Sequence, residues 1–187
     1  NLEIHGNGDV QLARVSAKGD MSLGSSDQLL LSTQVTAGGN AILEADEIVL
    51  EATALLAAAT TRLTAENIST EIGAQVAARG DLQLAAGTLD NAGVLTTARA
   101  LRVDISGLLS NSGSIEAQTD FNLNAAALTN SGSLLLLDGA MNINVSNLID
   151  NRAGSILHGG TQLTVNGIGL DNRGGEISSN GISTITV

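Results

Sequence analysis

The chain has 187 residues, of which 19 are Asp or Glu and eight are Lys or Arg, and its net charge is −11. A chain with this charge repels polyanions such as DNA and heparin, so we expect no nucleic-acid partner. Cysteine, proline, tryptophan and tyrosine are absent and Phe121 is the only aromatic residue, so disulfides cannot stabilise the fold. No apolar stretch approaches the ~20 residues of a membrane-spanning helix, so we expect no membrane insertion.

Aliphatic residues recur about every twenty positions from the first coil to the last. A period of this length is too short for a pair of packed helices and indicates the stacked coils of a solenoid. Three such series run side by side, so we expect each coil to have three inward-facing sides. The series are Leu23, Leu43, Leu63, Leu84, Val103, Leu123, Ile143, Val165 and Ile185; Val10, Leu29, Ile48, Ile68, Leu89, Leu109, Leu128, Leu148 and Leu170; and Val15, Val35, Leu55, Val76, Leu95, Ile115, Leu134, Ile156 and Ile177.

Within each coil, apolar and polar residues alternate, as in Leu82-Gln83-Leu84, which is the period of a strand. We therefore predict an all-β fold, a right-handed parallel β-helix of about nine coils with roughly 20 residues per coil. Residues 1–187 form one continuous rod in this interpretation. Leu2 and Ile4 align with Met21 and Leu23, so we expect the chain to be a segment of a longer rod.

Two repeat subtypes meet near residue 88. In residues 1–88 the turns carry Gly-Asp or Gly-Asn, as in Gly19-Asp20 and Gly39-Asn40. Within this part, residues 44–71 contain six acidic residues and a single basic one, Arg62, and this imbalance predicts a solvated face that opposes aggregation. The six are Glu44, Asp46, Glu47, Glu51, Glu66 and Glu71.

One turn of the first subtype contains the tripeptide Arg79-Gly80-Asp81. An exposed Arg-Gly-Asp turn is how many ligands bind integrins, so these residues are a candidate partner-binding site. The alternative is ordinary turn chemistry, because Gly-Asp recurs at Gly8-Asp9 and Gly19-Asp20 and only Arg79 is then left to coincidence. We expect the next residue, Leu82, to point into the core and hold Asp81 close to the rod.

Residues 89–187 repeat the pattern Leu-x-Asn-x-Gly, or a one-residue expansion of it. Asn tolerates left-handed backbone geometry and can bond to the turn or to the next Asn of a stack, so we predict a structural ladder. We expect the following glycine to supply a positive φ. The ladder consists of Asn91, Asn111, Asn130, Asn151 and Asn172.

Near the C-terminal end, Asp150-Asn151-Arg152 and Asp171-Asn172-Arg173 stack at a spacing of 21. We expect diagonal Asp/Arg pairs to offset the stacking of like charges. His5 and His158 are many coils apart and cannot act together. We expect both to be ordinary surface residues.

The Leu-x-Asn-x-Gly-x-Ile repeats, strongest over residues 89–177, resemble the haemagglutinin repeats of filamentous haemagglutinin and related two-partner-secreted bacterial exoproteins. The resemblance implies a β-helical shaft that a partner transporter exports across the outer membrane. It also implies a secreted or cell-surface location and a role in virulence. The family's secretion domain carries an Asn-Pro-Asn motif, which a chain without proline lacks, so we expect this segment to lie downstream of that domain.

These observations favour a structural shaft segment of a filamentous adhesin that contributes to host-cell attachment, with a host-cell receptor, an integrin among the candidates, as partner. The alternative is the stalk of a contact-dependent growth inhibition protein that presents a distal receptor-binding or toxin domain. Many parallel β-helices are enzymes, but their sites need long loops, and coils that vary by only one or two residues leave no room for them. We expect no enzymatic activity, no metal and no cofactor.

Overall fold

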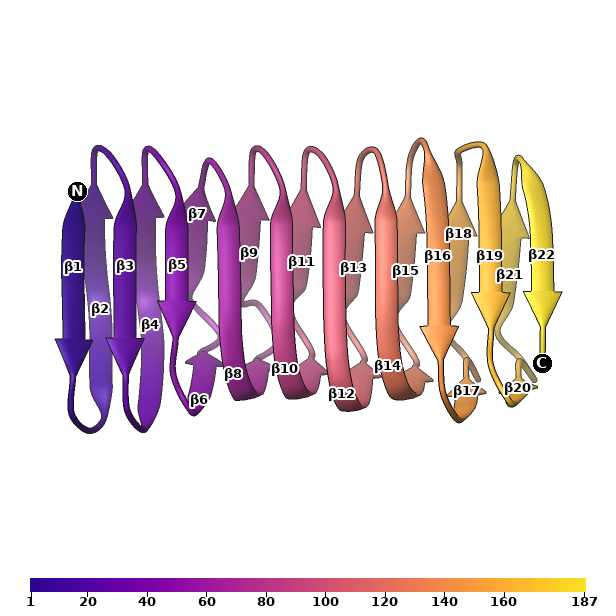
Figure 1. Cartoon of the computed structure of the whole chain (residues 1–187), viewed down its shortest axis with the longest axis horizontal. Coiled ribbons are helices and arrows are strands. Elements are labelled where there is room, and N and C mark those ends of the chain that lie inside the picture. The colour runs from indigo at the N-terminus through magenta and orange to yellow at the C-terminus, as the bar shows by residue number, and fades with distance from the viewer.

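The computed structural model describes all 187 residues and contains 22 β-strands and no helix. The strands stack into a rod whose cross-section has three sides (Figure 1). Every strand pairing is parallel and joins residues about one repeat apart, for example Leu23 with Leu43 and Val103 with Leu123. In Figure 1 the near strands run downward, the far strands run upward and the chain advances from left to right, which makes the helix right-handed. The prediction of a parallel β-helix of about nine coils is confirmed.

The three faces follow one another in chain order around each coil. The first face consists of β1 (Leu2–Gly6), β3 (Met21–Ser25), β5 (Ala41–Glu44), β16 (Ala140–Val145), β19 (Gln162–Asn166), β22 (Ile182–Thr186) and the first parts of β8 (Thr61–Thr70), β10 (Leu82–Asn91), β12 (Leu101–Asn111) and β14 (Phe121–Asn130).

The second face is the shortest, and long strands reach it by bending around a corner. It consists of β6 (Glu47–Leu50), β17 (Leu148–Asp150), β20 (Gly169–Asp171), the last parts of β8, β10, β12 and β14, and the first parts of β2 (Val10–Ala17) and β4 (Gln28–Ala37).

The third face returns the chain to the start of the next coil. It consists of the last parts of β2 and β4 together with β7 (Leu55–Ala58), β9 (Gln75–Ala78), β11 (Val94–Thr97), β13 (Ser114–Ala117), β15 (Ser133–Leu136), β18 (Ser155–His158) and β21 (Glu176–Ser179).

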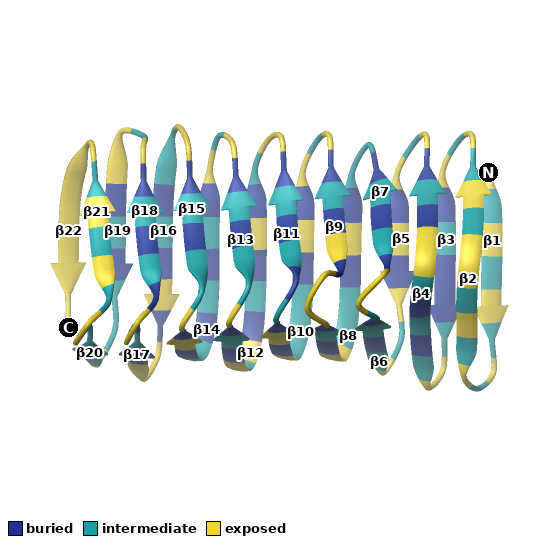
Figure 2. Ribbon diagram, turned by 180° about the vertical axis from the view of Figure 1, so that it is seen from behind, coloured by how far each residue is buried: buried dark blue, intermediate teal, exposed yellow.

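Burial alternates along the strands, and the inward-facing residues form one core (Figure 2). All 41 buried hydrophobic residues belong to a single cluster, so no internal gap divides the rod. The first predicted series is confirmed at every step, from the pairing of Leu23 with Leu43 to that of Val165 with Ile185. Like residues stack on like, which is how a core of modest aliphatic side chains is filled without aromatic rings.

Two residues of the other series are wrong by one position. Leu128 pairs with Ile149, which is 0% exposed, whereas Leu148 is 51% exposed. Val35 pairs with Leu56, not Leu55. Both errors follow extra residues at a corner, and in each place two adjacent aliphatic residues satisfy the twenty-residue period equally well.

The glycines of the second subtype have a different role from the predicted one. The only glycines with positive φ are Gly73, Gly139 and Gly174. A Cβ on Gly113 would instead lie 2.0 Å from the Gly93 carbonyl oxygen of the coil before it. Close stacking of the turns, and not backbone conformation, therefore requires glycine here. Among the asparagine turns, a positive φ occurs only in the two expanded ones, at Ala153 and Gly174.

Candidate functional site

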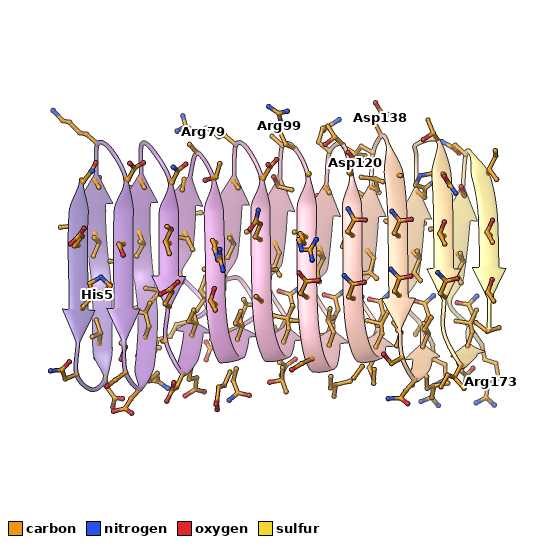
Figure 3. All side chains as sticks on the ribbon, in the orientation of Figure 1. His5, Arg79, Arg99, Asp120, Asp138 and Arg173 are labelled. Carbon is orange, nitrogen blue, oxygen red and sulfur yellow. The ribbon has the colours of Figure 1, made fainter.

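The Arg-Gly-Asp tripeptide forms the turn between β9 and β10, at the edge where the third face meets the first (Figure 3). Arg79 and Asp81 are exposed, and Leu82 is fully buried beneath them, as predicted. The Arg79 Nη2 donates to the Gly38 carbonyl at 2.9 Å, two coils toward the N-terminus. The Asp81 Oδ1 accepts from the Ala100 N–H at 3.3 Å, one coil toward the C-terminus. Both charged groups therefore lie along the rod and already have partners.

The Asp81 contact is a recurring device of this edge. The Asp20 Oδ1 accepts from the Asn40 N–H at 2.8 Å, and the Asp120 Oδ1 accepts from the Ala140 N–H at 3.0 Å. A carboxylate at this position binds the main chain of the next coil, which explains why the turn chemistry selects Asp after a small residue. Gly8-Asp9 does not belong to this series, because it precedes β2 at the corner between the first and second faces.

The five asparagines lie at the corner between the second and third faces and are joined amide to amide. Asn91 Nδ2 donates to Asn111 Oδ1 at 2.7 Å, and Asn111 Nδ2 donates to Asn130 Oδ1 at 2.8 Å. The chain of bonds continues through Asn151 to Asn172, each at 2.6 Å. The first four residues are at most 1% exposed.

The second amide hydrogen of each buried rung also has an acceptor. Asn111 Nδ2 donates to the Ser133 carbonyl at 3.2 Å, and Asn130 Nδ2 donates to the Ser155 carbonyl at 3.1 Å. A buried amide is costly unless its groups are bonded, so this complete pairing is what makes a polar stack tolerable in the core. The inner ladder, as we call Asn91 to Asn172, thus joins neighbouring coils through both side chain and main chain.

Thr70 occupies the position before Asn91 in the column of the inner ladder. Its hydroxyl donates to Asn91 Oδ1 at 2.6 Å and accepts from the Gly93 N–H at 3.1 Å. On its other side Thr70 pairs with Leu50, which pairs with Leu31. The same column of the rod is therefore leucine in the first coils and asparagine in the later ones. The sequence repeat did not predict this shared column, because the two subtypes are recognised by residues at other positions of the coil.

Charged pairs occupy the last coils. Arg152 binds Asp150 at 2.6 Å within its own coil and Asp171 at 3.6 Å diagonally, and Arg173 binds Asp171 at 2.7 Å. The hydrogen bonds from the Arg173 side chain lower the pKa of Asp171 to about 2. The Arg152 side chain likewise lowers the pKa of Asp150. Because solvent screens exposed pairs of this kind, their contribution to stability is small.

His5 is exposed as expected, but the prediction for His158 is wrong. His158, the last residue of β18, is 3% exposed. Its Nδ1 lies 2.8 Å from Ser179 Oγ and its Nε2 lies 3.1 Å from the Gly139 carbonyl oxygen. Both ring nitrogens have partners, so the imidazole is a satisfied part of the core. In the acidic stretch, Glu47 accepts from the Gln28 side chain and Glu71 accepts from the Ala52 N–H, and no three His, Asp or Glu side chains are close enough together to hold a metal ion.

A repeat-built parallel β-helical rod with short turns is the class of protein that this fold defines. The haemagglutinin repeat model matches residues 4–86, 36–113, 77–153 and 136–187, which together cover almost the whole chain. The chain belongs to the haemagglutinin repeat family. No curated protein and no solved structure matches it. The structure contains no helix that is long and apolar enough to cross a membrane.

Proposed function

We propose that this chain is a shaft segment of a secreted or cell-surface bacterial filamentous adhesin, and that it contributes to host-cell attachment by extending the parent protein from its anchor. The observation that supports this most is the single continuous core, in which every coil pairs with the next in parallel register. Such a rod gains about 4.8 Å of length for each coil, so its structure is suited to holding one part of the parent protein far from another. We assign it no catalytic role and no cofactor. Export would depend on an outer-membrane partner transporter, as in the resembled exoproteins.

Integrin engagement by Arg79-Gly80-Asp81 is a second candidate, favoured by the exposure of the two charged residues on a turn. It requires the receptor to replace the bonds to Gly38 and Ala100. The shaft proposal and the integrin proposal therefore differ in one respect. In the first the turn is a stacking device, and in the second it is a ligand.

Attachment of beads coated with the chain separates these roles. The tested variant is Asp81→Glu, and the matched control is Asp120→Glu, which alters the same bond two coils away. If the turn is a ligand, Asp81→Glu lowers attachment to host cells and Asp120→Glu does not. The shaft proposal predicts that both variants behave like the wild type.

Reach is tested directly by adding coils. The chain is displayed on a bacterial surface with a small binding domain at its outer end, and a second copy of residues 102–121 is inserted in register. The shaft proposal predicts more efficient capture of ligand-bearing targets as coils are added, and equal capture at every length would contradict it. Running the assay with host cells and with bacteria as targets also addresses the alternative, a growth-inhibition stalk, because that parent protein would act on bacteria.

A further inference from the structure

The chain contains three Asn-Gly dipeptides, at Asn7-Gly8, Asn166-Gly167 and Asn180-Gly181. In such a dipeptide the main-chain nitrogen of the glycine can attack the side-chain amide of the asparagine, because glycine has no side chain to hinder the approach. The attack needs an asparagine side chain that is free to turn and a glycine N–H that can lose its proton. The fold places the three pairs in different surroundings, so the same dipeptide has a different reactivity at each position.

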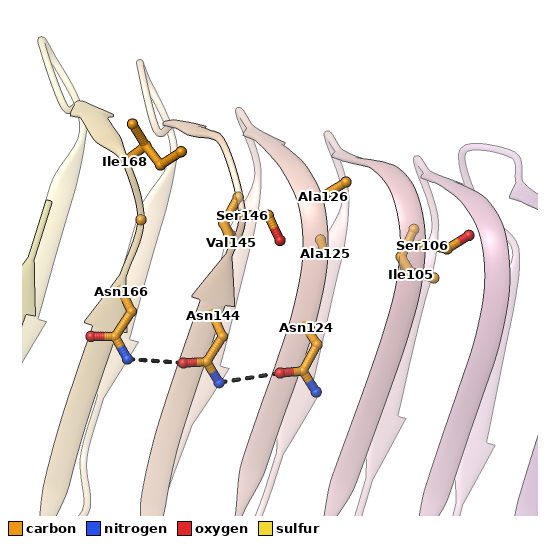
Figure 4. Close-up of a pocket in the computed structure, with 11 residues that line it drawn as sticks. Ile105, Ser106, Asn124, Ala125, Ala126, Asn144, Val145, Ser146, Asn166 and Ile168 are labelled. Atoms are coloured by element: carbon orange, nitrogen blue, oxygen red, sulfur yellow. Dashed lines mark hydrogen bonds between the residues drawn. The ribbon is translucent and has the colours of Figure 1, made fainter.

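The pair Asn166-Gly167 is held at both reacting groups. Asn166 Nδ2 donates to Asn144 Oδ1 at 2.9 Å, and the Gly167 N–H donates to the Thr186 carbonyl at 2.9 Å (Figure 4 shows the bond between the two asparagines). A carbonyl oxygen accepts a hydrogen bond but does not take up the proton, so this pair is protected from the attack.

The pair Asn7-Gly8 has the opposite surroundings. Asn7 is exposed, and neither its side-chain amide nor the Gly8 N–H has a hydrogen-bond partner in the protein. The reacting groups are therefore free, but no hydrogen bond connects the glycine nitrogen to a base. This pair provides the reference rate for an unassisted reaction.

The pair Asn180-Gly181 lies in the turn between β21 and β22, where the third face meets the first. Both residues are exposed, and the Asn180 side chain has no hydrogen bond. The Asn180 N–H donates to the His158 carbonyl at 3.0 Å, which holds the turn against the coil before it. A Cβ on Gly181 would lie 2.3 Å from the Thr161 carbonyl oxygen, so the stacking of the coils requires glycine after Asn180.

The Gly181 N–H donates to a hydroxyl that is itself bonded to a buried imidazole. Gly181 N lies 3.2 Å from Ser179 Oγ, and Ser179 Oγ lies 2.8 Å from His158 Nδ1. The other acceptor within reach of this hydroxyl, the Gly181 carbonyl oxygen, is farther away at 3.5 Å. His158 Nε2 carries the ring hydrogen, because its partner, the Gly139 carbonyl oxygen, only accepts. In the neutral ring Nδ1 then has the lone pair, and the Ser179 hydroxyl donates to it.

We propose that Asn180 is a site of spontaneous deamidation, and that Ser179 accelerates the reaction by relaying a proton to His158. Ser179 passes its proton to His158 Nδ1 and takes the proton of the Gly181 nitrogen. That nitrogen forms a bond to Asn180 Cγ, and the bond between Cγ and Nδ2 breaks. Nδ2 leaves as ammonia with the proton that His158 returns through Ser179. A water molecule from the solvent then opens the cyclic imide, which leaves aspartate or isoaspartate in place of Asn180.

The product changes the turn at which the chain passes from β21 to β22. Either form adds one negative charge to this edge of the rod, and isoaspartate also adds a methylene group to the main chain. The inference does not depend on the shaft proposal, because the continuous core extends the parent protein whether or not Asn180 is modified.

The test is incubation of the purified chain at neutral pH, with deamidation followed by peptide mapping and mass spectrometry. Trypsin cleaves after Arg14, Arg152 and Arg173, among other sites, so the three pairs fall in three different peptides. Asn180 is expected to react about tenfold faster than Asn7, because general-base catalysis by a positioned side chain contributes at least that much. Asn166 is expected to react most slowly. Equal rates at Asn7 and Asn180, or a faster reaction at Asn166, would overturn the proposal.

Variants of the relay test its two members. Ser179→Ala removes the hydroxyl, so Asn180 is expected to react about tenfold more slowly, with no change at Asn7. Ser179→Thr keeps a hydroxyl and is expected to retain the wild-type rate. His158→Leu, which repeats the Leu136 of the preceding coil, is expected to slow the reaction as Ser179→Ala does.

The matched control is Ser178→Ala, a neighbouring residue on the exposed side of β21, which is expected to leave all three rates unchanged. The direction of the change separates the relay from a purely structural role. A variant that only loosened this coil would free the glycine N–H groups and speed deamidation, whereas loss of the relay slows it at Asn180 alone. Circular dichroism establishes that the variants remain folded. An unchanged or faster reaction at Asn180 in Ser179→Ala, or an equal loss in Ser178→Ala, would refute the relay.

Discussion

The first and second halves of the rod fill the same corner column with opposite chemistry. In the first half the column is Leu12, Leu31 and Leu50, and in the second half it is the inner ladder, with Thr70 between them. The leucines are stabilised by burial alone and need no partner. The four buried asparagines are tolerated because each is bonded to the coils on both of its sides. The comparison shows that one backbone accepts either solution, provided that each residue matches its neighbours along the stack.

The turns beside this column also differ in length along the rod. Between the second and third faces, the coils with Leu50 and Thr70 turn through Glu51–Ala54 and Glu71–Ala74, loops that project from the rod (Figure 2). The tip of the second loop holds Ile72, which is 81% exposed, and Gly73 with a φ of 99°. The coils of Asn91, Asn111 and Asn130 have shorter turns, whereas the coils of Asn151 and Asn172 again turn through expanded corners that hold Ala153 and Gly174. The asparagine column is therefore compatible with either length of corner.

The largest effect is expected when an asparagine is placed among the leucines. Leu50→Asn removes a buried side chain and introduces an amide that Leu31 cannot bond and that faces a Thr70 hydroxyl already bonded to Asn91 and Gly93. We therefore expect the free energy of unfolding to fall by about 4 kcal/mol. The control is Thr70→Asn in the next coil, where Asn91 can accept a bond, and its expected cost is below about 1 kcal/mol. Urea unfolding followed by circular dichroism measures both. Equal losses would show that matching along the stack is unimportant.

The reverse exchange should be nearly as costly. Asn111→Leu leaves the amide of Asn91 without its acceptor and the Asn130 Oδ1 without its donor, so we expect a loss of about 3 kcal/mol. Asn122→Leu, on the outer side of the first face, serves as control and should change stability by less than about 0.5 kcal/mol, because water can bond the Asn142 amide that it leaves. Unfolding in urea again gives the answer. A neutral Asn111→Leu would mean that the inner ladder adds no stability.

Some features of the fold and of the candidate site could be predicted from the sequence and others could not. The period located the three faces and the asparagine column, because stacking demands similar residues one coil apart. It failed at Leu55 and Leu148, where an adjacent aliphatic residue fits the period as well and a longer corner decides between them. It also failed for His158, because the preceding residues of its column, Ala117 and Leu136, are apolar and gave no reason to expect a buried imidazole there. A second series of amide bonds, from Asn166 to Asn144 and from Asn144 to Asn124, was missed because its members lie outside the core and need not recur in every coil.

A smaller gain is expected from removing a polar group that has no partner. Thr61 is 2% exposed, pairs with Ala41 and Leu82, and its hydroxyl has no hydrogen bond. Thr61→Val should therefore raise the free energy of unfolding by about 1 kcal/mol. Thr97 is equally buried, but its hydroxyl bonds to the Gly80 carbonyl, so Thr97→Val should lower stability. Thermal melts of both variants test the pair, and the same sign for both would refute the argument.

The smallest effect concerns the exposed charge pairs at the end of the second half. The pKa of Asp171 is lowered to about 2 by its bonds to Arg173, so the unfolded chain binds this proton more readily than the folded one. The stabilisation is therefore complete above about pH 4 and is lost as the pH falls toward about 2. Arg173→Gln should flatten this part of the pH dependence in urea midpoints measured between pH 5 and 2. An unchanged profile would exclude a contribution from the pair.

Hydrogen exchange of the asparagine side chains, followed by NMR, tests the central claim most directly. If buried amides joined coil to coil hold the second half together, the Nδ2 hydrogens of Asn91, Asn111, Asn130 and Asn151 exchange slowly with solvent. Those of the half-buried Asn142 and of the exposed Asn144 should exchange much faster in the same sample. Rapid exchange at all of these positions would contradict a bonded inner ladder.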